Sequence, residues 1–201
     1  MSNNAELTKQ KILVEAEREF AKKGPYASSI NVISERSTIN KRMIYHYYHS
    51  KEELYKEVLR MNFNKIKIIV GEKVCINQND LIACIKQLIK DYYYFLRDNE
   101  NYVKIMAWEE TSGAEVAKNV IPDTFLIIYD RLQDIYYEGV KQGIFKEQID
   151  LNQLVISVSG LCFFTFARKE VLYNLWVDDL ETKLNERLEH IYSLILNTLC
   201  I

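Results

Sequence analysis

Residues 28–54 carry two short helix patterns, a tight turn between them and the capped start of a third helix. In the first pattern Ile30 and Ile33 are the apolar positions, and the two serines before them stand where hydroxyl side chains commonly cap a helix. The pattern stops at Ser37 and Thr38, whose hydroxyl groups compete with the helical backbone for hydrogen bonds. This spacing predicts a helix, a turn and a second helix.

The second short helix begins after Asn40, a residue type that caps helices. Met43, Ile44 and Tyr47 lie one, three and four residues apart, so we expect these three side chains to face the core. Ser50, three residues before a glutamate, then forms a capping box that opens a third helix. Helix, turn and helix in this order form a DNA-binding unit whose second helix enters the major groove.

The candidate DNA contacts are polar or charged side chains at the helix starts and on the outward face of the second helix. They are Ser28, Ser29, Asn40, Lys41, Arg42, Tyr45, His46 and Lys51. Lys and Arg neutralise phosphates, Arg also binds a guanine edge, Asn and His reach base edges, and a Tyr hydroxyl binds phosphate. At Lys51 an ammonium adds to the exposed N–H groups of a helix start, a favourable place for a phosphate. The alternative is that these side chains form an ordinary charged surface in contact with solvent. The helix caps, the position of the turn and the basic outward face together favour DNA binding over this alternative.

Charge is distributed unevenly along the chain. Residues 1–60 contain 11 Lys and Arg against 8 Asp and Glu, and residues 61–201 contain 15 against 20, within a formal net charge of −2. The basic excess accompanies the proposed DNA-binding segment, as expected for nucleic-acid binding. Because the excess is small, we expect DNA affinity to require a dimer.

A family resemblance covers residues 8–59, about a quarter of the chain. The matching landmarks are Ile12, Ala16, Phe20-Ala21, Lys23-Gly24, Ala27-Ser28-Ser29-Ile30, Ile33, Ile44-Tyr45-His46 and Ser50-Lys51-Glu52-Glu53-Leu54. In these positions, and without gaps, the chain resembles the N-terminal domain of TetR-family transcription regulators of bacteria. It departs from the family pattern at Ser37, at Pro25, at Arg42, which widens the basic surface, and at Thr38. The family's usual turn glycine falls at Thr38, where a β-branched side chain resists positive φ.

Composition and apolar spacing predict an all-α protein. The 201 residues include only two prolines and six glycines, and 48% of them are hydrophobic, which is ample for a core. From residue 77 onward apolar positions recur at three and four, without strand-like alternation or repeats. We expect a three-helix DNA-binding domain over 1–49, extending into a long helix over 50–70, and a larger ligand-binding and dimerisation domain over 71–201, with about nine helices in all. The long helix is the natural connection between ligand and DNA sites.

The last two predicted helices, over 150–175 and 180–199, have broad apolar faces. These faces exceed what one small domain needs inside, so we expect the pair to form a four-helix bundle with a second copy. The resemblance implies the same, since family members dimerise through their last two long helices. The candidate interface residues are Leu154, Val158, Leu161, Leu184, Leu188, Ile191 and Ile195. The alternative is that all of these side chains are intramolecular core.

Aromatic residues are dense in the middle of the C-terminal part. Most aromatic stripes at helical spacing are core, but the resemblance implies a small-molecule inducer pocket there, and such pockets are apolar with a few polar groups. The candidate lining residues, with Glu109 or Arg168 as the polar anchor, are Met106, Trp108, Glu109, Phe125, Tyr129, Phe163, Phe166 and Arg168.

Several other classes of protein are disfavoured. The motifs GxSxG, GxxxxGK[ST], HExxH and GxGxxG do not occur, so an enzyme is not expected, and no cofactor is implied. His46 and His49 could share a metal but have no third ligand nearby in sequence, so we expect none. No apolar run reaches the roughly 18 residues of a membrane span, and four scattered cysteines suit a reduced, cytoplasmic protein.

The sequence therefore predicts a cytoplasmic homodimer that binds a palindromic operator in double-stranded DNA and is released by a hydrophobic or aromatic inducer, most simply as a repressor. The alternative is a helical protein-interaction adaptor without sequence-specific DNA binding, which would leave the basic face at residues 40–46 unexplained.

Overall fold

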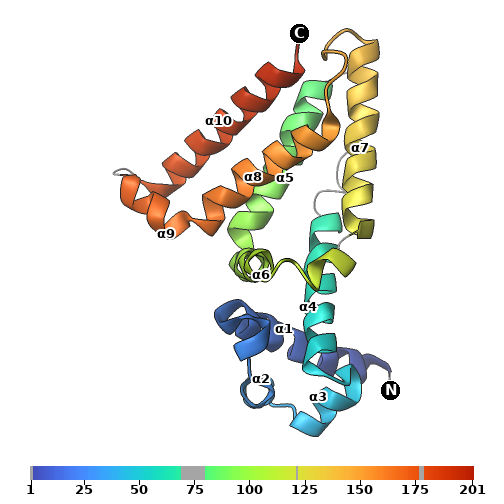
Figure 1. The fold of residues 1–201 in the computed structure, drawn as a ribbon, viewed down its shortest axis with the longest axis vertical. Coiled ribbons are helices and arrows are strands. Elements are labelled where there is room, and N and C mark those ends of the chain that lie inside the picture. The colour runs from blue at the N-terminus through green and yellow to red at the C-terminus, as the bar shows by residue number, and fades with distance from the viewer. Residues whose placement is uncertain (1, 69–79, 121, 177–178) are drawn as a thin grey trace. The chain divides into compact units, whose positions relative to one another are not determined.

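The computed structural model describes residues 2–68, 80–120, 122–176 and 179–201. In this part of the chain the structure consists of α-helices and short turns, and the only β-pairing is an isolated bridge between Phe145 and Cys200. The helices are α1 Ser2–Ala27, α2 Ile30–Ser37, α3 Lys41–Tyr48, α4 Lys51–Ile66, α5 Leu81–Asp98, α6 Glu100–Thr111, α7 Pro122–Lys141, α8 Leu151–Ala167, α9 Lys169–Leu172 and α10 Leu180–Leu199 (Figure 1). Two 3₁₀ turns, η2 Ala117–Asn119 and η3 Tyr173–Leu175, complete the described elements. The prediction of an all-α fold is confirmed.

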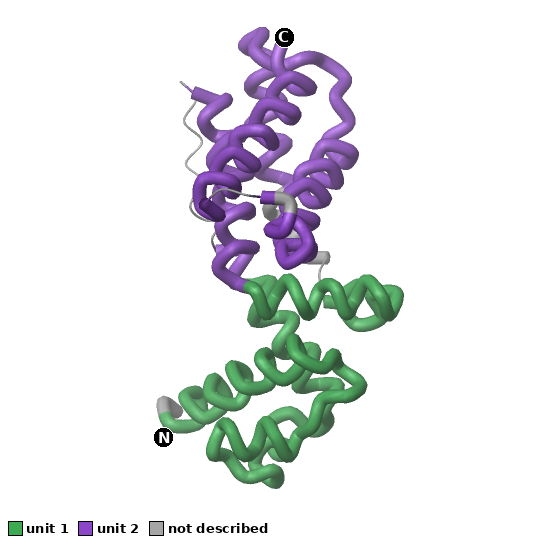
Figure 2. The backbone as a smooth tube through the Cα atoms, turned by 90° about the vertical axis from the view of Figure 1, so that its left-hand side faces the viewer, with its two compact units in different colours: residues 1–64, 100–122 green, residues 65–99, 123–201 purple. Residues whose placement is uncertain are grey.

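The chain divides into two compact units (Figure 2). The first unit contains residues 1–64 and 100–122, and the second contains residues 65–99 and 123–201. As a compact body, the first unit thus includes α6 and η2, which the sequence analysis assigned to the C-terminal domain. The functional boundary near residue 70 stays a prediction.

The first unit has a core built from the inward faces of α1 to α4. Ile12 and Phe20 of α1 are fully buried, and Leu54 begins the buried face of α4. The Phe20 ring meets the Tyr55 ring edge to face, with 4.9 Å between centroids. This geometry is favourable for aromatic pairs and fixes α4 against α1.

Helix α6 packs along α1 within this unit. The indole Nε1 of Trp108 donates to the carbonyl oxygen of Ala21 at 3.3 Å. Its ring lies against Gly24, which has φ +73° and interrupts α1 before Pro25 and the last helical residues. A Cβ at Gly24 would lie 3.0 Å from Cδ2 of Trp108, so both the backbone conformation and the close approach require glycine here.

Glu109, next to Trp108, is the buried polar centre of the first unit. Its side chain accepts hydrogen bonds from the Tyr55 hydroxyl at 2.7 Å, from the Ala117 amide at 2.8 Å and from the Val116 amide at 3.3 Å. Glu109 is 1% exposed. Burial, reinforced by the Glu109 carboxylate, raises the pKa of Tyr55 above its ordinary value. Helices α4 and α6 and the start of η2 are therefore joined by one carboxylate.

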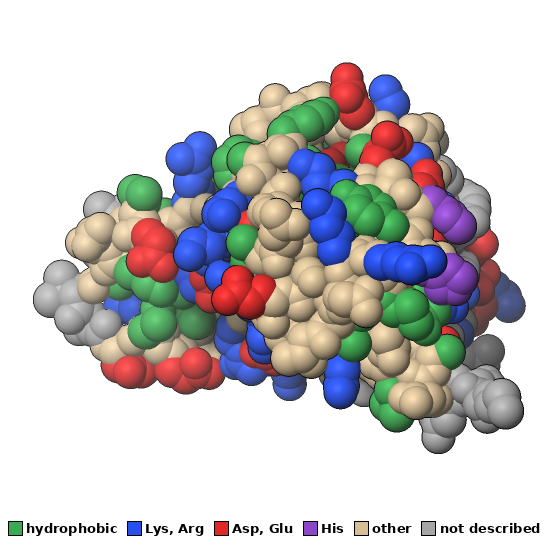
Figure 3. Space-filling view, turned by 90° about the horizontal axis from the view of Figure 1, so that it is seen from below, with side chains coloured by type: hydrophobic (Ala, Val, Ile, Leu, Met, Phe, Trp, Pro, Cys, Tyr) green, Lys and Arg blue, Asp and Glu red, His purple; other side chains and the backbone are tan. Residues whose placement is uncertain are grey.

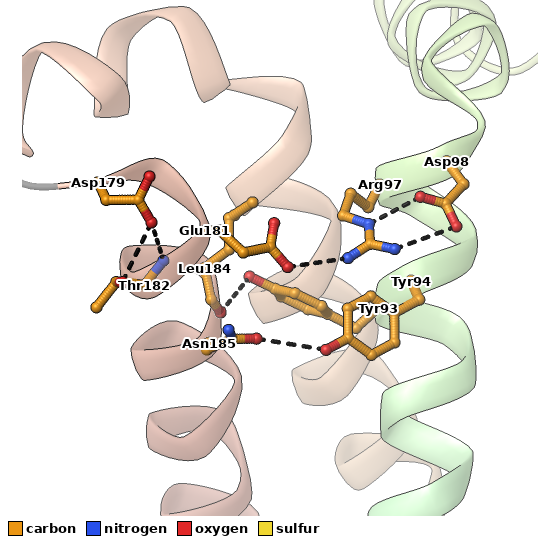
Figure 4. Close-up of polar contacts among 9 residues, drawn as sticks. All are labelled: Tyr93, Tyr94, Arg97, Asp98, Asp179, Glu181, Thr182, Leu184 and Asn185. Carbon is orange, nitrogen blue, oxygen red and sulfur yellow. Dashed lines mark hydrogen bonds and ion pairs between the residues drawn. The ribbon is translucent and has the colours of Figure 1, made fainter.

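The second unit packs α5, α8 and α10 together. The Tyr93 hydroxyl donates to the carbonyl oxygen of Leu184 at 3.0 Å, and Arg97 pairs with Glu181 at 3.4 Å (Figure 4). On the other side of Tyr93, the ring of Phe166 in α8 lies 4.8 Å away between centroids. A single buried tyrosine thus contacts both long C-terminal helices.

The second unit ends with α10 joined to the loop after α7. The Lys146 amide donates to Leu199 O at 2.8 Å, and its ammonium binds Asn197 O at 2.8 Å, as suits a cation at a helix C-terminus. Phe145 is buried against Gly139, where a Cβ would lie 2.0 Å from the phenyl ring. Glycine at 139 therefore makes room for the phenyl ring that anchors this loop.

One predicted helix is divided in the structure, and the predicted end of another lies outside the described residues. The predicted helix over 150–175 is interrupted, because α8 ends at Ala167 and α9 begins at Lys169, with Arg168 (φ −113°, ψ 17°) between them. The predicted long fourth helix is described as α4 Lys51–Ile66, and its expected last residues, 69–70, lie outside the described part.

Candidate nucleic-acid interface

Helix α3 is fixed at both ends by local and non-local hydrogen bonds. The Asn40 side chain accepts from the Met43 amide at 2.9 Å, which confirms the predicted N-cap. Ile44 and Tyr48 are the buried side chains, and the Tyr48 hydroxyl donates to the Lys9 carbonyl at 3.2 Å. The expectation that Met43 would face the core is wrong, since its side chain is 37% exposed. An eight-residue helix buries only a narrow face, and in α3 this face is occupied by Ile44 and Tyr48, which lie four positions apart.

The outward face of α3 carries basic and hydrogen-bonding side chains. Lys41, Arg42, Tyr45 and His46 are all exposed. Among the described residues no ion pair is recorded for Lys41 or Arg42, while the Lys41 ammonium lies 6.0 Å from the centre of the Tyr45 ring. Figure 3, which views the end of the molecule bearing α2 and α3, shows many Lys and Arg side chains on this face, with histidine at one edge. The face is chemically suited to phosphates and base edges.

Several acidic side chains of the first unit are paired with nearby cations. Glu19 is fully buried and binds Lys23 at 3.0 Å and Arg36 at 3.4 Å. Lys56 lies 2.8 Å from both Glu52 and Glu53. These acids are therefore neutralised locally.

The turn between α2 and α3 has the left-handed conformation that its sequence resists. Thr38 has φ 60° and ψ 19°, and its amide donates to Glu35 O at 3.3 Å. Ser34 Oγ donates to Ile39 O at 2.6 Å and stabilises the next residue of the turn. The turn therefore keeps the geometry that glycine would adopt without strain.

The three predicted DNA contacts at the helix starts differ in burial and in their hydrogen-bond partners. Ser28 is buried, and its hydroxyl donates to the carbonyl oxygens of Gly24 and Glu19. Ser29 is the N-cap of α2, with extended backbone and no side-chain capping bond. The Lys51 ammonium donates to the carbonyl oxygens of Tyr26 at 2.7 Å and Ser28 at 3.2 Å.

The capping box predicted at the start of α4 is confirmed in one of its two bonds. Ser50 Oγ accepts from the Glu53 amide at 3.0 Å. The Glu53 carboxylate instead pairs with Lys56, and hydrogen bonding to this lysine lowers the pKa of Glu53.

The residues predicted to line an inducer pocket are divided between the two compact units. Met106, Trp108 and Glu109 lie on α6, and the last two already have the protein partners described above. The remaining predicted residues lie on α7 and α8 or directly after α8, in the second unit; they are Phe125, Tyr129, Phe163, Phe166 and Arg168. The side chain of Phe125 is outside the described part. The pocket stays a prediction.

Most residues predicted for the dimer interface are covered inside the second unit. Those with at most 5% exposure are Leu154, Leu184, Leu188, Ile191 and Ile195. Val158 and Leu161 are partly exposed. The large apolar side chains of α8 and α10 that are more than a third exposed are others: Ile156 (62% exposed), Phe164 (54%), Leu194 (42%) and Leu180 (40%). The two helices thus have an inner apolar face and a separate exposed one.

Two other kinds of feature are absent from the described residues. No group of three or more His, Cys, Asp or Glu side chains there is arranged to hold a metal ion. In the same residues, no helix is long and apolar enough to cross a membrane.

The fold and the exposed face of α3 define a helix-turn-helix protein, and comparison with known proteins gives its family. Residues 12–58 match the model of the tetR family of bacterial regulatory proteins, and residues 82–195 match a tetracyclin repressor-like C-terminal domain. The chain therefore belongs to the TetR family and is a DNA-binding regulator of transcription, not an enzyme.

Similar proteins include named repressors and a solved structure. The chain is 26% identical to the HTH-type transcriptional repressor NicS of Pseudomonas putida over 90% of this chain and 86% of that protein. It is 29% identical to the HTH-type transcriptional repressor SCO4008 of Streptomyces coelicolor over 85% of this chain and 86% of that protein. The fold is similar to the crystal structure of HlyIIR, a hemolysin II transcriptional regulator, with a TM-score of 0.67, 22% identity and coverage of 98% and 99% of the two chains.

Proposed function

We propose that this protein is a ligand-responsive repressor that binds a palindromic operator as a homodimer. The observation that carries the proposal is the exposed basic face of α3, which is set by the Asn40 cap and the buried Ile44 and Tyr48. The two relatives named as repressors support the direction of regulation. A regulator of this kind acts where the chromosome is, so we place it in the cytoplasm.

The proposed DNA contacts are the side chains that the fold leaves exposed near the major-groove helix. Arg42 and Asn40 are candidates for base edges, with Lys41 and Tyr45 for phosphates. His46, which is exposed, and Ser29, which is partly exposed at the N-cap of α2, are further candidates. Two-fold symmetry would place a second α3 on the next half-site, about 34–36 Å or somewhat more away.

The homodimer would form through the exposed face of α8 and α10. Ile156, Gly160 and Phe164 lie at spacings of four along α8, on one side of the helix. A Cβ at Gly160 would meet nothing within 4 Å, so a second helix could approach closely there. Leu194 adds an exposed apolar side chain from α10. This surface supports a four-helix bundle made from two copies.

The inducer is proposed to be a small hydrophobic or aromatic molecule bound among the helices that follow α4. Tyr129 and Phe163 are partly exposed aromatic candidates for its contacts, and Arg168, which is exposed, could bind an acidic group. To move the dimer from 1:99 to 99:1 between its two states, such a ligand must prefer one state by about 5.5 kcal/mol. The DNA-bound state and the released state must therefore differ at the pocket.

Selection of bound sequences from random duplex DNA, at a stated salt concentration, tests the proposal. Enrichment of a palindrome with two half-sites is expected and would supply the probe for a ligand screen. Saturable quenching of Trp108 and Trp176 fluorescence by a hydrophobic ligand, together with release of the probe, would support the inducer. No enrichment by the purified dimer would favour an adaptor function instead.

A further inference from the structure

Two charged residues that are not part of the exposed α3 face form hydrogen bonds with the connection between α1 and α2. Lys51, the first residue of α4, donates to Tyr26 O and Ser28 O at 2.7 and 3.2 Å. Glu19 of α1 accepts from the Ser29 amide at 3.4 Å. Neighbouring residues of the connection are thus held by an ammonium from α4 and a carboxylate from α1.

The position of Lys51 is electrostatically unusual. The first turn of a helix favours acidic side chains because the helix dipole is positive there, and a lysine is therefore disfavoured. Lys51 directs its ammonium back to the carbonyl groups at the end of α1, which form the negative end of that helix. Two of its three N–H donors are occupied by these oxygens. Its side chain is directed to the protein backbone and not only to solvent.

Glu19 is equally committed to protein partners. Its carboxylate is fully buried and binds Lys23 and Arg36 as well as the Ser29 amide. Arg36 lies in the last turn of α2, so Glu19 holds both ends of that helix. Since the short turn at Thr38 joins α2 directly to α3, the placement of α2 also limits where α3 can lie.

We infer that Lys51 and Glu19 are positioning residues for DNA binding, which act by fixing α2, and through it α3, against α1 and α4. This inference rests on the proposed operator binding. It differs from the expectation that Lys51 is a phosphate contact, because a positioning residue contributes no released counterion on DNA binding.

The salt dependence of operator affinity separates the two roles for Lys51. Each neutralised phosphate adds about 0.9 to the slope of log K against log salt, so one contact per half-site adds about 1.8 in a dimer. Lys51→Met should weaken operator binding at least tenfold and leave this slope unchanged, whereas Lys51→Arg should restore much of the affinity. The matched control Lys41→Gln removes an exposed ammonium and should reduce the slope by about 1.8.

The direction in which operator affinity changes in Glu19→Gln tests the positioning role of Glu19. Glu19→Gln keeps the shape but removes a negative charge, which by charge alone would strengthen binding to DNA. Positioning predicts the opposite, a loss of at least fivefold. Glu35→Gln removes an exposed acid from α2 and should leave affinity equal or higher. All variants are compared at a temperature where circular dichroism shows the same helix content as the parent, so lost stability alone would not change the affinity.

The outcomes are distinct. A slope that falls by about 1.8 in Lys51→Met would make Lys51 a phosphate contact and overturn its positioning role. Equal or tighter binding by Glu19→Gln would overturn the role of Glu19. If Lys51→Met does not fold, Lys51→Gln decides by the same measurement, because its amide keeps a donor for a backbone carbonyl but carries no charge: weaker binding with an unchanged slope is expected, and a slope that falls by about 1.8 would contradict the inference. If the parent protein selects no operator, the proposed function fails as a whole, and that result is separate from a failure of either variant.

Discussion

The hydrogen bond between Tyr55 and Glu109 should contribute measurably to the stability of the first unit. The Tyr55 hydroxyl donates to a carboxylate at 2.7 Å, both residues are at most 2% exposed, and 54 residues separate them in the chain. A hydrogen bond to a charged group contributes about 1.5–3 kcal/mol to stability. We therefore expect Tyr55→Phe to lower the free energy of unfolding by about 2 kcal/mol.

Glu109→Ala should cost more than Tyr55→Phe, because it also leaves the Ala117 and Val116 amides without their carboxylate acceptor. Unsatisfied buried donors cost about 1–3 kcal/mol each, partly offset by no longer burying a charge, so a loss of about 3–4 kcal/mol is expected. In the double variant the Tyr55 contribution should disappear, which gives a coupling energy of about 1.5–3 kcal/mol.

Urea unfolding followed by Trp108 fluorescence is the appropriate assay, since its indole packs against α1. Protein concentration must be the same for all four proteins because dimer formation is linked to stability. A coupling energy below about 0.5 kcal/mol, the scatter typical of independent sites, would refute the argument that this bond joins α4 to α6.

Three further results are expected. Arg42→Ala should weaken operator binding by about tenfold or more per half-site, since a base or phosphate contact of this kind is worth about 1–3 kcal/mol, and unchanged affinity in a gel-shift titration would exclude Arg42 from the interface. Gly139→Ala should lower stability by about 1–3 kcal/mol, because its Cβ would lie 2.0 Å from the ring of Phe145, and an unchanged midpoint of thermal unfolding would contradict this. Burial raises the pKa of Cys162 to about 12, while an unfolded thiol titrates near 8.5; the unfolded state therefore loses its proton first, and stability should fall as pH rises from about 8.5 to 12. This pH dependence is checked by comparing the denaturant midpoints of Cys162→Ala and the parent across this pH range. If the two midpoints change in parallel with pH, Cys162 is not the group responsible.

Local sequence signals predicted the elements of the DNA-binding surface correctly. Asn40 at the start of α3 and Ser50 before α4 each accept the backbone hydrogen bond expected of a cap. Capping depends on residues two or three positions apart, so a single sequence contains the needed information. Helices α3 and α4 therefore begin where the sequence predicts them.

Contacts between distant segments could not be predicted in the same way. The apolar face of α10 was recognised, but a stripe of leucines does not say whether its partner is α5 of the same chain or a second copy. Glu109 lies beside Trp108 in sequence, and no neighbouring residue indicates that its carboxylate accepts a hydrogen bond from Tyr55. The hydrogen bonds from Lys51 to two backbone carbonyl oxygens could not be predicted either, because backbone acceptors leave no trace in side-chain patterns.

Thr38, whose backbone is left-handed, shows both what the sequence predicts and what it does not. The family resemblance located a turn glycine at this position, and the positive φ is present in spite of the β-branched side chain. Surrounding hydrogen bonds, such as that from Ser34 to Ile39, support the turn where the local residue preference opposes it.

The discontinuous first unit has a consequence for synthesis on the ribosome. Residues 1–64 emerge well before residues 100–122, which carry Trp108 and Glu109. At about 5–20 residues per second, the nascent chain waits roughly 3–12 s between residue 60 and residue 122. During that interval Tyr55 lacks its acceptor and Gly24 lacks the indole that covers it. A half-made chain should therefore be a poor DNA binder and a target for chaperones, so that competence to bind DNA is acquired only after α6 has been translated.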